Sequence, residues 1–155
     1  MIRIDFSRMP RNCNSYDQYI ERIERILIQD LMEAYPKADI QEEDAVWDSL
    51  DLVYERYGCQ RFIFVFDEWD CIFHKDFITD EDKKKYISFL SSLLKDKAYV
   101  LLSYMTGILP IAKYSSGSEL NMFAEYTMVS EEKFSDAFGF TEAEVDMLYA
   151  RFLKN

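Results

Sequence analysis

Two adjacent acidic residues stand directly after an uninterrupted apolar run. The run Phe62–Phe66 consists of aromatic and β-branched residues, and Asp67 and Glu68 follow it without a spacer. Such a run is typical of a strand that is covered on both faces in a parallel α/β sheet. Ligands of these sheets bind at the carboxyl ends of the strands. Neighbouring carboxylates at that position could hold Mg²⁺ and orient a water molecule beside a phosphate group, so the sequence predicts metal-assisted phosphoryl chemistry here.

An apolar strand that ends in an acidic pair has the form of a Walker B motif, whose usual companion is a phosphate-binding loop, G-x-x-x-x-G-K-[ST]. The chain has four glycines, and its nearest match to that loop is the segment Gly107–Tyr114. Ala112 takes the place of the second glycine, and Tyr114 takes the place of the Ser or Thr. Pro110 removes one amide donor. We therefore reject this segment and expect that residues 1–155 contain no Walker A loop.

The composition restricts the class of protein. The chain has 155 residues, 49% of them hydrophobic, which suits one domain with a substantial core. Its formal net charge of −11 argues against direct nucleic-acid binding. Cys13, Cys59 and Cys71 lack C-x-x-C spacing, so we expect neither a zinc site nor disulfides, and a cytoplasmic location. The sequence shows no apolar run of membrane-spanning length and no leader-like start, so we expect no membrane partner and no secretion.

The elements that would position the acids follow from the periodicity of apolar residues. We expect strands over Ile2–Phe6, Arg61–Phe66 and Tyr99–Met105, and a further extended piece over Tyr126–Val129. We expect helices from Ser15 to about Tyr35, from about Glu42 to Tyr57, from Thr79 to about Leu94, and from Thr141 onward. The apolar stripe of the first helix would consist of Tyr19, Ile23, Ile26, Leu27, Leu31 and Met32. The alternation of strands and helices predicts a mainly parallel α/β sheet.

Four segments of the chain together resemble the bacterial AAA-ATPase-like family. They are Asp67–Asp70, Met105–Lys113, Leu120–Tyr126 and Phe138–Val145, and their order and spacing match the family over the larger, carboxyl-terminal part of the chain. In that family a Walker A loop precedes a strand similar to Ile2–Phe6, and a restriction-endonuclease-like domain often follows. The resemblance implies that residues 1–155 are a single incomplete AAA-ATPase-like domain, with Walker B and sensor 1-like strands but no Walker A loop.

The fold that the resemblance implies is a partial P-loop NTPase-like three-layer sandwich, with a mainly parallel sheet that lacks the Walker A strand. The family's strand order is 5-1-4-3-2, and this chain would supply strands 2, 3 and 4, with strand 5 left open. Strand 4, Tyr99–Met105, would then have an unpaired apolar edge, which proteins usually cover or pair. We expect self-association or a protein partner at that edge, or its occupation by Tyr126–Val129.

The resemblance also assigns roles to individual residues. Asp67 would bind the Mg²⁺ that accompanies ATP, and Glu68 would orient the attacking water. Thr106 would be the sensor that contacts the γ-phosphate, although a threonine that caps a turn at a strand end is an equally ordinary interpretation. Asp70 is a further candidate metal ligand. His74, the single histidine, is expected in a loop rather than as a general base.

Two functions remain open at this point. In the first, the chain would be the Walker B and sensor portion of an ATP hydrolase, whose ancestral activity is Mg²⁺-dependent ATP hydrolysis. We then expect it to be inactive alone, because positioning of the phosphates is most of what a protein contributes to phosphoryl transfer. Alternatively, it is a non-enzymatic interaction module that retains the fold and associates through an exposed sheet edge. Whether the chain is an enzyme therefore stays open.

Overall fold

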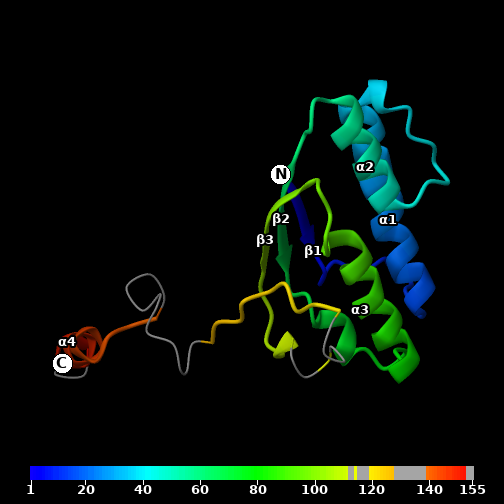
Figure 1. Ribbon diagram of the computed structural model, residues 1–155. Coiled ribbons are helices and arrows are strands. Elements are labelled where there is room, and N and C mark those ends of the chain that lie inside the picture. Colours follow the sequence, from blue (N-terminus) through cyan, green and yellow to red (C-terminus); the bar gives the residue numbers. More distant parts are fainter. Residues whose placement is uncertain (112–113, 115–118, 128–138, 153–155) are drawn as a thin grey trace. The chain divides into compact units, whose positions relative to one another are not determined.

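The computed structural model describes residues 1–111, 114, 119–127 and 139–152 (Figure 1). The chain divides into two units, Met1–Met122 and Phe123–Asn155. The first unit contains the strands β1 (Ile2–Asp5), β2 (Phe62–Asp67) and β3 (Val100–Met105), the helices α1 (Tyr16–Ala34), α2 (Val46–Arg56) and α3 (Asp80–Leu94), and the short 3₁₀ helices η1 (Pro36–Ala38) and η2 (Cys71–His74). The second unit contains α4 (Glu142–Phe152).

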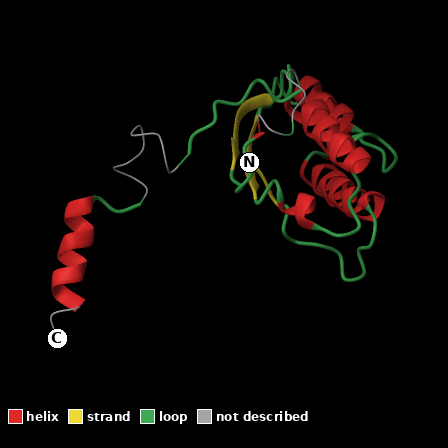
Figure 2. Ribbon diagram, turned by 90° about the horizontal axis from the view of Figure 1, so that it is seen from below, coloured by secondary structure: helices red, strands yellow, loops and turns green. Residues whose placement is uncertain are grey.

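The three strands form one sheet in the order β1-β2-β3, and both strand pairs are parallel. The predicted α/β class with a parallel sheet is therefore confirmed. Each crossover moves one position in the same direction across the sheet, from β1 to β2 and then from β2 to β3. Right-handed crossovers that move in one direction place their helices on one face. Figures 1 and 2 show α1, α2 and α3 on the same side of the sheet.

The core of the first unit lies between this covered face and the helices. Phe62, Phe64 and Phe66 of β2 are buried, and the ring of Phe66 meets that of Phe6 edge to face with the centroids 5.3 Å apart. The expectation that β2 is covered on both faces is wrong for the first unit, because the intervening Ile63 is 36% exposed. The reason is topological, since neither crossover places a helix on that side of the sheet.

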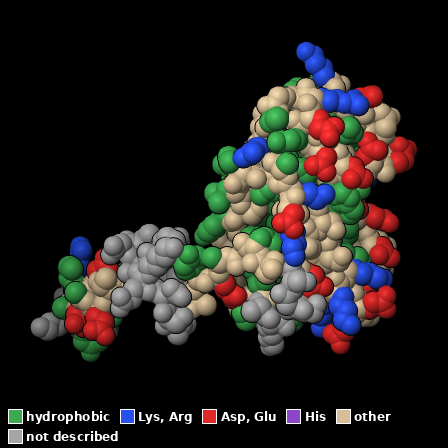
Figure 3. All heavy atoms as spheres, in the orientation of Figure 1, with side chains coloured by type: hydrophobic (Ala, Val, Ile, Leu, Met, Phe, Trp, Pro, Cys, Tyr) green, Lys and Arg blue, Asp and Glu red, His purple; other side chains and the backbone are tan. Residues whose placement is uncertain are grey.

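The open face and the free edge of the sheet are apolar. The exposed side chains are Ile63 of β2 together with Leu101, Leu102 and Tyr104 of β3, and the last two are 56% and 52% exposed. Figure 3, which has the orientation of Figure 1, shows hydrophobic side chains along the margin where the sheet lies, whereas charged side chains gather over the helices. Among the described residues β3 pairs only with β2, so the predicted unpaired edge is present.

The helix boundaries follow local capping signals. Ser15 accepts a hydrogen bond from the Gln18 amide at the start of α1, and Thr79 forms a capping box with Asp82 at the start of α3, as predicted. The second helix begins at Val46 rather than near Glu42, because the Asp44 carboxylate accepts from the Gln41 amide and holds a turn instead.

The buried stripe of α1 differs in part from the prediction. Tyr19, Leu27 and Leu31 are buried as expected. Ile26 is exposed, and the additional buried side chains are Tyr16, Ile20 and Ile28. The helix is therefore rotated relative to the predicted face, so that Ile26 lies at its margin.

In the second unit, α4 confirms the helix that was expected from Thr141 onward. Thr141 and Glu144 cap it reciprocally, with the Glu144 amide donating to the Thr141 hydroxyl and the Thr141 amide donating to the Glu144 carboxylate. Of the predicted extended piece, Tyr126 and Thr127 lie outside any strand, and residues 128–129 lie outside the described part of the chain. Among the helices that the structure describes, none has the length and apolar character needed to cross a membrane.

Candidate functional site

The candidate site lies where the carboxyl ends of the three parallel strands meet. Asp67 is the last residue of β2, and Thr106 directly follows β3. The Thr106 hydroxyl donates a hydrogen bond to Asp67 Oδ1 with an O···O distance of 2.6 Å. The Thr106 amide donates to the carbonyl oxygen of Phe66 at 2.9 Å and thereby extends the ladder beyond β3. The fold thus brings together two of the residues that the sequence singled out, Asp67 and Thr106.

A second aspartate, which the sequence analysis passed over, lies at the same end of the sheet. Asp5 ends β1 and is the register partner of Asp67. Its carboxylate accepts from the hydroxyl and the amide of Ser7 and from Arg8 Nε. The Ser7 hydroxyl is the largest cause of the lowered pKa of Asp5, and Arg8 adds to it. Asp5 is thus already hydrogen-bonded by Ser7 and Arg8. Like Asp67, it could have been found in the sequence as an acidic residue at the end of a predicted strand.

The other oxygen of Asp67 is available at the surface. Asp67 Oδ2 lies 3.8 Å from Arg3 Nη2, and both side chains are well exposed, so this ion pair is weak. Carboxylate and hydroxyl oxygens are ligands that suit Mg²⁺, which usually keeps several waters and takes only one or two protein carboxylates alongside phosphate oxygens. No group of three His, Cys, Asp or Glu residues that could hold a metal occurs in the described ranges. Asp67 and Thr106 therefore fit a Mg²⁺ ion that is held jointly with phosphate, and do not form a closed metal site.

Glu68 is exposed and adopts the left-handed backbone conformation, with φ of 54°. This conformation is unfavourable for a residue with a Cβ. Strained backbone of this kind is often found at functional sites. The turn leads the chain away from β2, and its first side chain after Asp67 is this exposed carboxylate.

Replacing Glu68 with glycine is expected to raise the free energy of unfolding by about 0.5–1 kcal/mol, because glycine adopts positive φ without strain. Glu43→Gly serves as the control, since Glu43 is an exposed glutamate whose φ is not positive. Urea denaturation followed by circular dichroism measures both variants. Equal destabilisation by both would show that the Glu68 backbone stores no strain.

Asp70 points inward, unlike Asp67. The residue is 1% exposed, and Oδ2 accepts from the amides of Ile108 at 3.0 Å and Leu109 at 2.7 Å. His74 Nε2 lies 4.0 Å from the same oxygen. The carboxylate that the sequence analysis gave as a further candidate metal ligand is thus already bound by backbone donors. Its burial is hard to foresee, because the alternation along β2 ends at the turn of Glu68.

The loop after β3 packs closely against the turn after β2. A Cβ on Gly107 would lie 2.4 Å from Trp69 Cδ1 and 2.5 Å from Asp70 Oδ1. Trp69 is buried, and its amide donates to the Thr106 carbonyl oxygen at 3.0 Å. The two amides after Gly107 point at Asp70, so they are not available to a phosphate group. Residues 112–113 of the segment Gly107–Tyr114 lie outside the described part of the chain.

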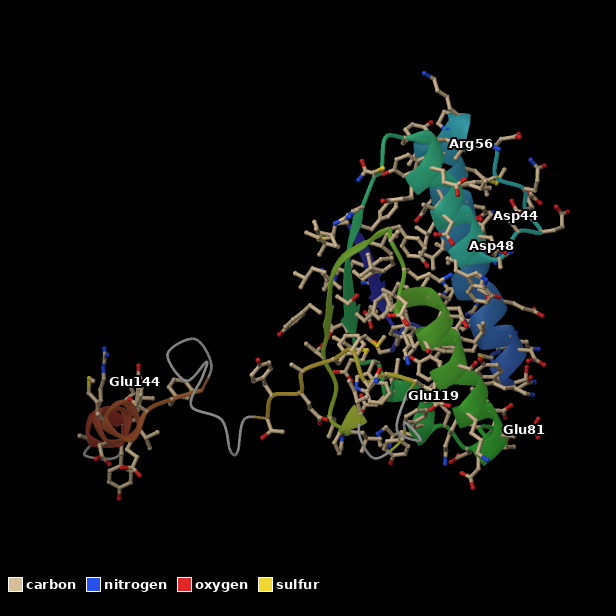
Figure 4. The ribbon with its side chains drawn as sticks, in the orientation of Figure 1. Asp44, Asp48, Arg56, Glu81, Glu119 and Glu144 are labelled. Carbon is tan, nitrogen blue, oxygen red and sulfur yellow. The ribbon has the colours of Figure 1, made fainter. Side chains whose placement is uncertain are left out.

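Figure 4 shows that other acidic side chains, including Asp44, Asp48 and Glu81, project from the region of α2 and from α3. They lie on the helical layer rather than among the strands, and they provide an internal comparison for cation binding.

Comparison with known proteins identifies no relative. No protein-family model, no curated protein and no solved structure matches the chain. The resemblance to the AAA-ATPase-like family therefore stays a prediction.

Proposed function

We propose that this chain is the Walker B and sensor portion of an AAA-ATPase-like ATP hydrolase of the P-loop class. The observation that carries the proposal is the 2.6 Å hydrogen bond between Thr106 and Asp67, which joins the ends of neighbouring parallel strands. Glu68 is exposed beside them. Carboxylate, hydroxyl and second carboxylate at the carboxyl end of a parallel sheet form the acidic half of a phosphoryl-transfer site.

Each residue has a distinct role in this proposal. Asp67 would hold Mg²⁺ through its exposed oxygen, and Glu68 would orient a water molecule beside the γ-phosphate. The Thr106 hydroxyl has one proton, which it donates to Asp67 in the ligand-free chain. As a sensor it would donate that proton to the γ-phosphate when ATP is bound. Bound Mg²⁺–ATP supplies the electrophilic phosphorus and its leaving group. Phosphate-binding amides and a lysine have to come from a further strand and loop, so we expect residues 1–155 alone to be inactive.

The strand order supports this division of the site. β1, β2 and β3 would correspond to strands 2, 3 and 4 of the implied order 5-1-4-3-2, with the vacant place for strand 1 beside β3. A crossover from that place to β1 would run across the sheet in the opposite direction to the two crossovers described above. Right-handedness would then place its helix on the open face, over Ile63, Leu102 and Tyr104. The exposed apolar face and the free edge thus have a common explanation, in which the complete fold is a three-layer sandwich.

A manganese titration tests the metal-binding part of the proposal. Mn²⁺ replaces Mg²⁺ at oxygen ligands and broadens nearby amide signals in NMR spectra. We expect the amides of Asp67, Glu68 and Thr106 to broaden at lower Mn²⁺ concentrations than those of Asp48 and Glu81. Asp67→Asn should remove this preference and Asp48→Asn should leave it intact. Broadening that begins at the helical acids and spares Asp67 would overturn the proposal.

Calorimetric titration of ATP with Mg²⁺ tests whether the chain needs a further phosphate-binding element. We expect no binding heat for the wild-type chain. Binding that disappears in Asp67→Ala would mean that the site assembles without a standard phosphate loop, and would make the chain an ATP-binding protein in its own right.

The apolar edge of β3 favours a second candidate, a non-enzymatic interaction module. β1 carries Arg3 and Asp5, charges of the kind that protect an edge strand, whereas β3 contains no charged residue and no proline. A module of this kind would pair β3 with a strand of a second copy or of another protein. Concentration-independent sedimentation as a monomer would contradict the self-association form of this candidate.

A further inference from the structure

Asp70 is a buried carboxylate for which the proposed mechanism has no use. We infer that Asp70 is a positioning residue: it anchors the loop Gly107–Leu109 and thereby holds the Thr106 hydroxyl against Asp67. The inference rests on the proposed function in so far as Thr106 and Asp67 act on a ligand. The anchoring itself is a property of the chain that can be measured without any ligand.

The bonds of Asp70 explain why a charged residue occupies a buried position. Burying a carboxylate is costly unless hydrogen bonds compensate it. Asp70 Oδ2 accepts from two backbone amides, those of Ile108 and Leu109, and hydrogen bonds to a carboxylate are stronger than those to a neutral acceptor. Asp70 Oδ1 has no hydrogen-bond partner among the described residues and lies against Gly107. One oxygen thus holds the loop, while the other is left in a tight space.

Thr106 is held on both sides of the strand end. Its amide donates to the Phe66 carbonyl oxygen, and its own carbonyl oxygen accepts from the Trp69 amide. Beyond Thr106 the ladder stops, and the next two bonds that fix the chain are those to Asp70. Without them the loop is free to rotate at Gly107, and Thr106 becomes the last restrained residue of a frayed strand. Asp70 therefore restrains Thr106 from the carboxyl side.

Two of the three carboxylates in the turn Asp67–Asp70, those of Asp67 and Asp70, thus have different roles. Asp67 presents an oxygen to the surface and accepts from Thr106, while Asp70, three residues later, fixes the loop that carries Thr106. Movement of the loop would change both the Thr106 hydroxyl and the orientation of the Asp67 carboxylate that binds it. A site that must distinguish phosphate states needs this hydroxyl in one position.

NMR measurements on the full chain test the inference in the absence of metal and nucleotide. The variants are Asp70→Ala, Asp70→Asn and the control Asp76→Ala. Asp76 is an exposed aspartate that, like Asp70, precedes α3 in the sequence. Hydrogen exchange of the Ile108 and Leu109 amides measures the anchoring. Three-bond couplings to the methyl carbon of Thr106 measure its χ1 rotamer.

We expect one Thr106 rotamer in the wild type and in Asp76→Ala. In Asp70→Ala, exchange at both amides should accelerate about tenfold or more, because two backbone donors lose their charged acceptor, and the Thr106 couplings should average between rotamers. Asp70→Asn keeps an acceptor oxygen but loses the charge, so both effects should be intermediate.

Faster amide exchange with an unchanged Thr106 rotamer would overturn the inference, because Asp70 would then stabilise the loop without positioning the hydroxyl. If Asp70→Ala does not fold, the same two readouts in Asp70→Asn decide between these outcomes. The Mn²⁺ titration is independent of this experiment. If Mn²⁺ shows no preference for Asp67 in the wild type, the proposed function is contradicted. The dependence of the Thr106 rotamer on Asp70 is still decided by the Thr106 couplings.

Discussion

Replacing Gly107 with alanine is expected to lower the free energy of unfolding by about 2–3 kcal/mol. The added Cβ would approach Trp69 Cδ1 to 2.4 Å and Asp70 Oδ1 to 2.5 Å, closer than atoms can pack. Neither neighbour can move easily, because Trp69 is buried and Asp70 holds two amides. The loop must therefore separate from the turn after β2. Urea denaturation monitored by tryptophan fluorescence measures the change, since Trp69 is itself at the contact.

Gly58→Ala is the matched control for this prediction. Gly58 has φ of +65° but nothing within 4 Å of an added Cβ, so its replacement tests backbone strain without crowding. We expect it to cost about 1 kcal/mol. Gly107→Ala should cost clearly more than Gly58→Ala, and it alone should accelerate exchange of the Ile108 and Leu109 amides. A smaller effect at Gly107 than at Gly58 would show that the loop does not pack against Trp69 and Asp70 in solution.

Local signals explain which parts of the fold could be predicted from the sequence. Ser15 and Thr79 mark helix starts because each supplies a side-chain oxygen to amides only a few residues away. The three strands are runs of apolar residues whose extent is also a local property. The covering of one face is not local, because it depends on the direction of both crossovers and on what occupies the place beside β3. The sequence run Phe62–Phe66 is equally apolar on both faces and could not report this difference.

The candidate site divides in the same way. Asp67 and Thr106 could be placed together because both end neighbouring parallel strands, and this geometry follows from the strand order. Asp70 was predicted as a further candidate metal ligand, and its buried position could not be foreseen, since the alternation of side chains along β2 ends at the left-handed turn at Glu68. The close approach at Gly107 likewise depends on a contact between residues far apart in the chain. The two residues at the strand ends were thus easier to place together than the buried carboxylate beside them.

The two faces of β2 provide the prediction with the largest expected effect. Phe64→Ala should lower the free energy of unfolding by about 3–5 kcal/mol, because the side chain is buried and leaves a cavity when removed. Its ring packs beside those of Phe66 and Tyr99. A domain of this size has a total stability of roughly 5–15 kcal/mol, so the variant should be close to unfolding at 37 °C. Thermal and urea denaturation both measure this loss.

The adjacent Ile63 is the control on the opposite face, and its cost distinguishes the two candidate functions. If the open face is in contact with water, Ile63→Ala should cost about 1 kcal/mol or less, because a partly exposed side chain gives up little burial. If copies of the chain cover that face, the cost should be larger and should rise with protein concentration, since association that buries Ile63 stabilises the folded state by mass action. A small, concentration-independent cost would contradict the self-association form of the interaction module, and it is the result expected of one part of an ATPase whose remaining strand and helix cover this surface. A large, concentration-dependent cost would favour the interaction module. In that case Asp67 and Glu68 would be surface residues at the end of β2 with no nucleotide to bind.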